Sequence, residues 1–185
     1  MPPFYTRQGD DGYTGLLGEG RVPKYHPQAE ALGTVDEATA ALGLARALSL
    51  SPDVQEVVRL VQQDLYHVMA ELASTPATAG RFASLAEERL AWVEAHTERF
   101  GSLVESPKEF ILPGDSLSAA AFALARTVVR RAERLVARLV HEGVAGRPEL
   151  LRYLNRLSSL CFVLELYENR LADKGAPTLA KDPRP

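Results

Sequence analysis

Five arginines with largely helical spacing are the feature of this chain that most clearly indicates chemistry. They are Arg126, Arg130, Arg131, Arg134 and Arg138. In a helix, which turns by about 100° per residue, they share one arc, opposite a run of apolar side chains. Such cations repel one another, and only Glu133 lies close by in sequence to offset them. The stripe therefore predicts an anionic partner, either carboxylates of another helix or a polyphosphate that suits guanidinium groups, with a solvated face as the alternative.

The N-terminal stretch 6–24 is a second candidate, because glycines alternate there with side chains that donate hydrogen bonds. The glycines are Gly9, Gly12, Gly15, Gly18 and Gly20, and the donors are Thr6, Arg7, Thr14, Arg21 and Lys24. Glycine lets the backbone approach a ligand closely, and these donors suit phosphate oxygens. The stretch lacks the Gly-Lys-Ser/Thr of a Walker A loop. On composition alone, a flexible N-terminal arm is an equal alternative.

A third candidate is the run Phe110-Ile111-Leu112-Pro113-Gly114-Asp115-Ser116, which directly precedes the arginine segment. It predicts a rigid apolar loop in which Phe110 lines an apolar pocket beside the anion site. A plain loop with a buried anchor is the alternative.

Asp36 is a carboxylate on the small-residue side of an expected helix over residues 27–48. If it is buried it requires a cation, which an arginine of the 116–140 segment, in this chain or in a neighbouring subunit, would supply. An exposed acid at the helix edge is the alternative.

Other catalytic chemistry has little support in the sequence. The four histidines, at 26, 67, 96 and 141, show no paired metal-ligand spacing, and a single Asp64-Leu65-Tyr66-His67 is insufficient for a di-iron bundle. The only cysteine, Cys161, lies in an apolar run and is predicted to be a small buried hydrophobe. If the chain is an enzyme, we expect it to position reactants that supply their own reactivity.

The elements that must position these residues are helices. Apolar spacings of three and four, with proline and capping signals, predict five of them, over about 27–48, 52–73, 84–101, 116–140 and 148–174. The third is expected to open with a capping box, Ser84 to Glu87. The fold class is therefore all-α, an up-and-down five-helix bundle with one core. Around the bundle domain at 28–173 we expect a glycine-rich nucleotide-binding segment at 1–27 and a flexible tail at 174–185.

Composition limits the partners. With 21 Lys and Arg against 24 Asp and Glu, the 185-residue chain carries a formal net charge of −3, so nucleic-acid binding through bulk charge is excluded. No apolar run approaches the roughly 20 residues that a membrane span needs, and the start carries no secretory signal. We expect no membrane partner and a cytoplasmic location.

Taken together, these segments resemble the PduO-type ATP:cob(I)alamin adenosyltransferases. The matching stretches are residues 5–14 with Lys24, then 30–37, 110–114, 125–134 and 153–158, in the family's order. Family members often read Pro-Gly-Gly where this chain has Pro113-Gly114-Asp115.

The resemblance implies a homotrimer with active sites between subunits, in which the N-terminal segment folds over ATP. The implied ATP-binding residues are Thr6, Arg7, Gln8, Gly9, Thr14, Lys24, Arg130, Arg131, Glu133, Arg134 and Asn155. Arg126 would pair with Asp36 across the interface. Phe110 and Pro113 would contact the corrinoid, and Arg130 and Phe110 would be the catalytic residues.

The implied reaction is attack of cob(I)alamin on the 5′ carbon of ATP, which displaces triphosphate and forms adenosylcobalamin. Because cobalt(I) is itself a strong nucleophile, no protein nucleophile is needed. The arginine stripe, Lys24 and Mg²⁺ would stabilise the leaving triphosphate, and Phe110 would exclude the lower axial ligand of cobalt. A cobalamin reductase and an adenosylcobalamin-dependent enzyme are the expected protein partners. Two alternatives remain: a non-catalytic carrier or sensor of ATP or a corrinoid, and a helical scaffold whose arginines pair only with carboxylates.

Overall fold

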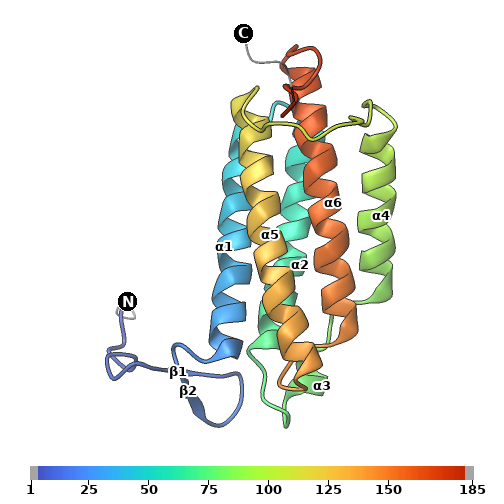
Figure 1. Cartoon of the computed structure of the whole chain (residues 1–185). Coiled ribbons are helices and arrows are strands. Elements are labelled where there is room, and N and C mark those ends of the chain that lie inside the picture. The colour runs from blue at the N-terminus through green and yellow to red at the C-terminus, as the bar shows by residue number, and fades with distance from the viewer. Residues whose placement is uncertain (1–3, 182–185) are drawn as a thin grey trace.

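The helices expected from apolar spacing are present in the computed structural model, which describes residues 4–181. The long helices are α1 (Pro27–Leu48), α2 (Pro52–Leu72), α4 (Glu87–Gly101), α5 (Leu117–His141) and α6 (Pro148–Leu171). They run alongside one another as an elongated bundle, with the short helix α3 (Ala79–Phe82) at one end (Figure 1). The all-α bundle is confirmed.

Three helix starts follow the capping signals of the sequence. The side chain of Ser51 accepts from the backbone N–H of Val54 at the start of α2, and that of Ser116 accepts from Ala119 at the start of α5. Helix α1 begins at Pro27, where a missing N–H costs nothing. These side-chain bonds satisfy N–H groups that lack an intrahelical partner.

Two helix ends differ from the expectation. Helix α4 begins at Glu87 rather than Ser84, because Leu85 is buried and its carbonyl accepts from Arg147, which keeps residues 84–86 outside the helix. Ser84 Oγ lies 3.1 Å from Nδ1 of His67 instead of capping the helix. Helix α6 ends at Leu171, three residues before the expected Lys174.

The core lies between α5 and its neighbours α1 and α6, with α2 packed on α1 and α4 packed on α6. Phe100, Phe122 and Tyr153 are the largest side chains buried there. Cys161 is fully buried, and burial raises the pKa of its thiol to about 12, so it is the buried hydrophobe that the sequence indicates.

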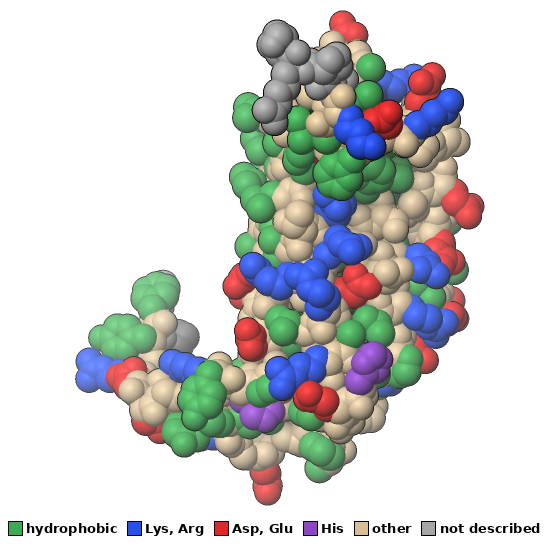
Figure 2. Space-filling model, in the orientation of Figure 1, with side chains coloured by type: hydrophobic (Ala, Val, Ile, Leu, Met, Phe, Trp, Pro, Cys, Tyr) green, Lys and Arg blue, Asp and Glu red, His purple; other side chains and the backbone are tan. Residues whose placement is uncertain are grey.

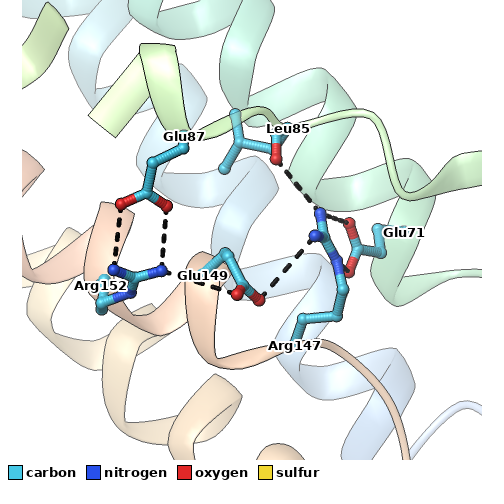
Figure 3. A network of polar contacts seen from close by, with 6 residues as sticks. All are labelled: Glu71, Leu85, Glu87, Arg147, Glu149 and Arg152. Carbon is cyan, nitrogen blue, oxygen red and sulfur yellow. Dashed lines mark hydrogen bonds and ion pairs between the residues drawn. The ribbon is translucent and has the colours of Figure 1, made fainter. Parts of the chain in front are cut away.

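One end of the bundle is held by a network of charged side chains (Figure 3). Arg147 donates to both carboxylate oxygens of the buried Glu71, at 2.7 and 3.0 Å, and to the carbonyl of Leu85. Arg152 binds Glu87 of α4 from the first turns of α6. This network fixes the loop before α6 against α2 and α4.

The N-terminal segment contains a hairpin that the sequence did not indicate. Strands β1 (Tyr13–Gly15) and β2 (Arg21–Pro23) pair antiparallel with Thr14 opposite Val22. Each strand has three residues, which is too short for an alternating pattern to show. In Figure 1 the hairpin lies at one end of the bundle, and the chain before it projects outward from α1.

Part of the C-terminal segment expected to form a flexible tail at 174–185 makes hydrogen bonds to the Phe110 loop. The N–H of Leu112 donates to the carbonyl of Thr178 over 2.8 Å, and the N–H of Ala180 donates to the carbonyl of Phe110 over 2.8 Å. Residues 178–180 therefore lie antiparallel to the loop that carries Phe110. The part of the expected tail at 182–185 lies outside the described residues. Within residues 4–181, none of the helices is both long enough and apolar enough to cross a membrane.

Candidate functional site

The arginine stripe of α5 splits into paired and unpaired members. Arg131 forms an ion pair with Glu37 of α1, and Arg138 binds Glu142 at 2.9 Å. Arg130 and Arg134 are exposed and form no hydrogen bond or ion pair with any residue between 4 and 181. In Figure 2 blue side chains gather across the middle of the face on which α5 lies. Two cations on neighbouring turns are thus available to an external anion.

A hydrogen bond between α5 and α6 lies beside these two cations. Asn155 Nδ2 donates to Oε1 of Glu133 over 2.8 Å, and both side chains are half-buried. Arg156 in turn donates to Oδ1 of Asn155 over 2.7 Å and to Glu94 over 2.8 Å. The structure therefore brings together three of the predicted nucleotide-site positions, Arg130, Glu133 and Asn155, with Arg134 adjacent.

The N-terminal loop is organised by Arg21, which the sequence placed among the possible phosphate donors. Arg21 binds Asp11 through two nitrogens, at 2.8 and 2.7 Å, and donates to the carbonyl of Gln8. The hydrogen bond from Arg21 lowers the pKa of the Asp11 carboxyl below its ordinary value. Because it is engaged in this way, Arg21 shapes the loop and is not a free donor.

Lys24 lies against the same loop. A Cβ at Gly9 would stand 3.0 Å from Nζ of Lys24, so the end of the lysine side chain packs closely against Gly9. The backbone N–H of Lys24 also donates to the carbonyl of Gly12 over 2.9 Å. The remaining predicted residues of the loop, Thr6, Arg7 and Gln8, are exposed, and Thr14 is half-buried in β1.

The two halves of the predicted nucleotide site are not joined within one chain. The segment before β1 projects away from the bundle, while Arg130 and Arg134 lie on the middle of α5 (Figure 1). Asp36, likewise, is exposed and does not pair with Arg126 among the described residues. The site is incomplete without a second copy of the chain if both halves bind one ligand.

An apolar pocket of about 350 Å³ lies next to the stripe. Its lining residues are Pro107, Glu109, Phe110, Ile111, Pro113, Arg126, Phe162 and Glu165. Phe110 is 74% exposed, so much of its side chain is available to a ligand. Arg126 lies over the ring of Phe162, 5.9 Å from its centroid. Phe110, Pro113 and Arg126, predicted from separate stretches of sequence, thus line one pocket.

Sequence reasoning missed Glu165, which also lines this pocket. The residue is 2% exposed, and its Oε2 has no hydrogen-bond partner within residues 4–181. Burial raises the pKa of its carboxyl to about 7, although the nearby Arg126 opposes the shift. The signal was available: an acid stands one turn after Cys161 on the apolar face of the last helix.

The Phe110 loop is held by Asp115. The carboxylate of Asp115 accepts from the backbone N–H of Thr178 over 3.1 Å and from its hydroxyl over 2.7 Å. The carboxylate therefore anchors the C-terminal segment that pairs with residues 110–112.

Known proteins resemble the chain along most of its length. The sequence model of the family described as cobalamin adenosyltransferase matches residues 4–168. The corrinoid adenosyltransferase PduO of Salmonella typhimurium is 40% identical over 169 residues, which are 90% of this chain and 49% of that protein. The chain thus spans about half the length of that relative. The corrinoid adenosyltransferase of Mycobacterium tuberculosis is 42% identical over 178 residues, covering 90% of this chain and 88% of the relative.

Solved structures agree with these matches. A PduO-type ATP:corrinoid adenosyltransferase from Lactobacillus reuteri, a phenylalanine-to-alanine variant complexed with cobalamin and ATP, superposes with a TM-score of 0.88 and 32% identity. The match covers 97% of this chain and 100% of that one. An arginine-to-lysine variant of the same protein, complexed with ATP, gives a TM-score of 0.85 at 30% identity, over 96% and 100% of the two chains.

Proposed function

The chain belongs to the cobalamin adenosyltransferase family, and on that premise we propose that it transfers the 5′-deoxyadenosyl group of ATP to cob(I)alamin. One observation carries the proposal: α5 presents an apolar pocket and an unpaired cation on successive turns. Arg126 lines the pocket, and Arg130 stands four residues further on, about 6 Å along the axis at a rise of 1.5 Å per residue. This arrangement supports binding of a corrinoid at the pocket and of a polyphosphate beside it on the same helix.

In this reaction the cobalt(I) centre supplies the electron pair that attacks C5′ of ATP. A cobalt–carbon bond forms, the C5′–O bond breaks, and triphosphate leaves with the bonding electrons. The reacting groups need no protein acid or base, so the contribution of the chain is to position the two substrates and to stabilise the negative charge that develops on the leaving group.

Arg130 and Arg134 are the groups that would meet the triphosphate. They are unpaired within residues 4–181, so binding an anion would not require them to break an existing ion pair. The hydrogen bond from Asn155 to Glu133 would hold the side chains of Asn155 and Glu133 in a fixed orientation toward the nucleotide. Arg131, bound to Glu37, would contribute charge near the site more than a direct contact.

The N-terminal loop would close over ATP from a neighbouring subunit of a homotrimer. Its contributing residues would be Thr6, Arg7, Gln8, Gly9, Thr14 and Lys24. Projection of the segment before β1 away from its own bundle supports an arrangement in trans. Exposed apolar side chains on α1 and α5, including Leu44, Leu117 and Leu124, support a subunit contact through these helices. Asp36 and Arg126 would pair across that contact.

Phe110 and Pro113 would contact the corrinoid, with Phe110 excluding the lower axial ligand of cobalt. The two residues line one pocket with Arg126. The solved Lactobacillus reuteri variants add support, because the phenylalanine and the arginine replaced in them are separated by twenty positions, as are Phe110 and Arg130. The same spacing supports Phe110 and Arg130 as the catalytic pair.

Magnesium would enter with the nucleotide. No group of three or more His, Cys, Asp or Glu side chains within residues 4–181 forms a metal cage. Mg²⁺ commonly keeps several waters and binds substrate phosphates, which suits an ion held mainly by the triphosphate. A reductase that delivers cobalt(I) and an enzyme that uses adenosylcobalamin would be the partners, and a reducing compartment such as the cytoplasm suits this chemistry.

The test is to mix the purified protein with ATP, Mg²⁺ and chemically reduced cobalamin, and to follow the visible spectrum. Conversion to adenosylcobalamin with stoichiometric release of triphosphate is the expected result. Binding of both ligands without conversion would instead identify a carrier or sensor and would overturn the proposal.

A further inference from the structure

Among the buried acids of residues 4–181, Glu165 alone has no hydrogen-bond partner. Four acidic side chains are buried there: Asp64, Glu71, Glu165 and Glu168. Asp64 accepts from Arg89 and Tyr153, Glu71 accepts from Arg147, and Glu168 accepts from Ser49 and from the N–H of Leu50. Glu165 forms no hydrogen bond to residues 4–181, and its Oε2 is fully enclosed. A buried carboxyl without a partner costs stability, so its presence indicates a ligand that completes it.

Arg126 presents the complementary unsatisfied group in the same pocket. Its Nε is buried and has no acceptor within residues 4–181. Although Arg126 is the nearest opposite charge to Glu165, the two side chains form no ion pair. The stack on Phe162 and the enclosure of Nε hold the guanidinium in place. Both side chains line the Phe110 pocket, so a guanidinium and a carboxyl that are not paired with each other lie at one cavity.

Three other charged residues lie near Glu165 or line its pocket. Arg126 lies on α5, Asp115 stands at the end of the Phe110 loop, and Glu109 lines the same pocket. The two acids disfavour a second anion in this space, while the rest of the lining is apolar. A neutral ligand group that both donates and accepts hydrogen bonds suits it best.

We propose that Glu165 and Arg126 bind a peripheral carboxamide of the corrinoid and so anchor that substrate in the Phe110 pocket. The carboxamide oxygen accepts from a terminal guanidinium N–H of Arg126, and its NH₂ donates to the Glu165 carboxylate. The remaining guanidinium nitrogens of Arg126 stay available for Asp36 of a neighbouring copy. This assignment rests on the proposed function, since it names the part of the corrinoid that the pocket holds.

The first experiment measures cobalamin binding without ATP, by calorimetry, for Glu165→Leu, Glu165→Gln and the control Glu168→Gln. Glu165→Leu is expected to weaken binding about tenfold, as for loss of a hydrogen bond to a charged group, while its melting temperature rises because an unpaired carboxyl is removed. Glu165→Gln retains hydrogen bonding and is expected to stay within about threefold. Glu168→Gln, one turn away, is expected to lower the melting temperature and leave cobalamin affinity unchanged. Unchanged binding by Glu165→Leu, or equal losses in the leucine and glutamine variants, would overturn the assignment.

The second experiment leaves the protein unchanged and varies the ligand. Partial hydrolysis of cobalamin gives isomeric monocarboxylic acids, in each of which a carboxylate replaces one carboxamide. One isomer is expected to bind about tenfold more weakly than cobalamin, because its carboxylate would face Glu165, Asp115 and Glu109. Equal binding of every isomer would overturn the assignment. Failure of the wild-type protein to bind cobalamin at all would instead overturn the proposed function, so the two failures are distinguishable.

Discussion

Asn155 donates to Glu133 over 2.8 Å, and this bond ties α6 to α5 on the turn between the unpaired Arg130 and Arg134. The contact lies 22 residues apart in sequence and holds the two helices that present the proposed nucleotide site. The orientation of the proposed nucleotide site therefore depends on how α6 packs against α5.

The Asn155–Glu133 bond is expected to matter for ATP rather than for the corrinoid. Asn155→Ala and Glu133→Ala should each raise KM for ATP about tenfold, and the double variant should be little worse than either single one, because both remove the same contact. Steady-state kinetics with each substrate varied in turn would check this. Additive losses would show that the two residues act separately.

The nucleotide site is expected to form between subunits. One variant, Arg7→Ala with Lys24→Ala, lacks the two cations that the loop contributes. A second variant, Arg130→Ala, lacks the unpaired cation that the stripe contributes. Each variant should be nearly inactive alone. Co-refolded in equal amounts, they should recover about a quarter of the wild-type activity, since a random trimer joins an intact loop to an intact stripe at one site in four. A mixture as inactive as its components would place both parts in the same chain.

Phe110 is expected to act on the cobalt step. Phe110→Ala should lower kcat about tenfold or more and leave the affinity for ATP near that of the wild type, because the ring lines the pocket and not the stripe. Leu112→Ala is the matched control, from the same loop but outside the pocket lining. Rapid-mixing spectra of cobalamin would separate this step from binding, and equal rates for the two variants would refute the role of the ring.

Asp115 is expected to position the Phe110 loop through Thr178. Asp115→Ala and Thr178→Val should each raise KM for the corrinoid about fivefold with little effect on ATP, because the carboxylate–hydroxyl bond of 2.7 Å holds the segment that pairs with the loop. Thr178→Ser keeps the hydroxyl and should behave as wild type. A corrinoid KM that is unchanged in Thr178→Val would contradict this role.

The pH dependence of stability should report Glu165. Its pKa is raised to about 7 by burial, so the folded protein holds this proton more tightly than the unfolded chain does. That contribution to stability is present in full below the ordinary carboxyl pKa and is lost as the pH rises through about 7. Between about pH 5 and about pH 8 the melting temperature of the wild type should therefore fall relative to that of Glu165→Gln. Parallel profiles for the two proteins would show that Glu165 does not titrate in this range.

The helices could be predicted from sequence because their signals are local. Ser51, Ser116 and the prolines at helix starts act on neighbouring N–H groups, and those ends were confirmed. The Ser84 signal was wrong because a distant contact prevailed: Arg147 binds the carbonyl of Leu85 across 62 residues and keeps the chain extended there.

The site could be predicted only in part for the same reason. Phe110, Pro113 and Arg126 come from stretches with distinctive composition, and the structure brings them to one pocket. Glu165 looks like one more acid on a helix until packing buries it, and the Asp115–Thr178 contact joins residues 63 positions apart. A local sequence pattern cannot predict a contact between residues so far apart in the chain.

The central claim is that unpaired cations of α5 hold the leaving triphosphate beside the Phe110 pocket, and one comparison tests it most directly. Arg130→Ala and Arg138→Ala remove the same charge from the same helix, but Arg138 is already bound to Glu142. With saturating ATP, Mg²⁺ and cob(I)alamin, Arg130→Ala should lose about 10²- to 10³-fold in turnover while its melting temperature stays close to that of the wild type, and Arg138→Ala should stay within about twofold. Wild-type turnover by Arg130→Ala, or equal losses in the two variants, would contradict the account.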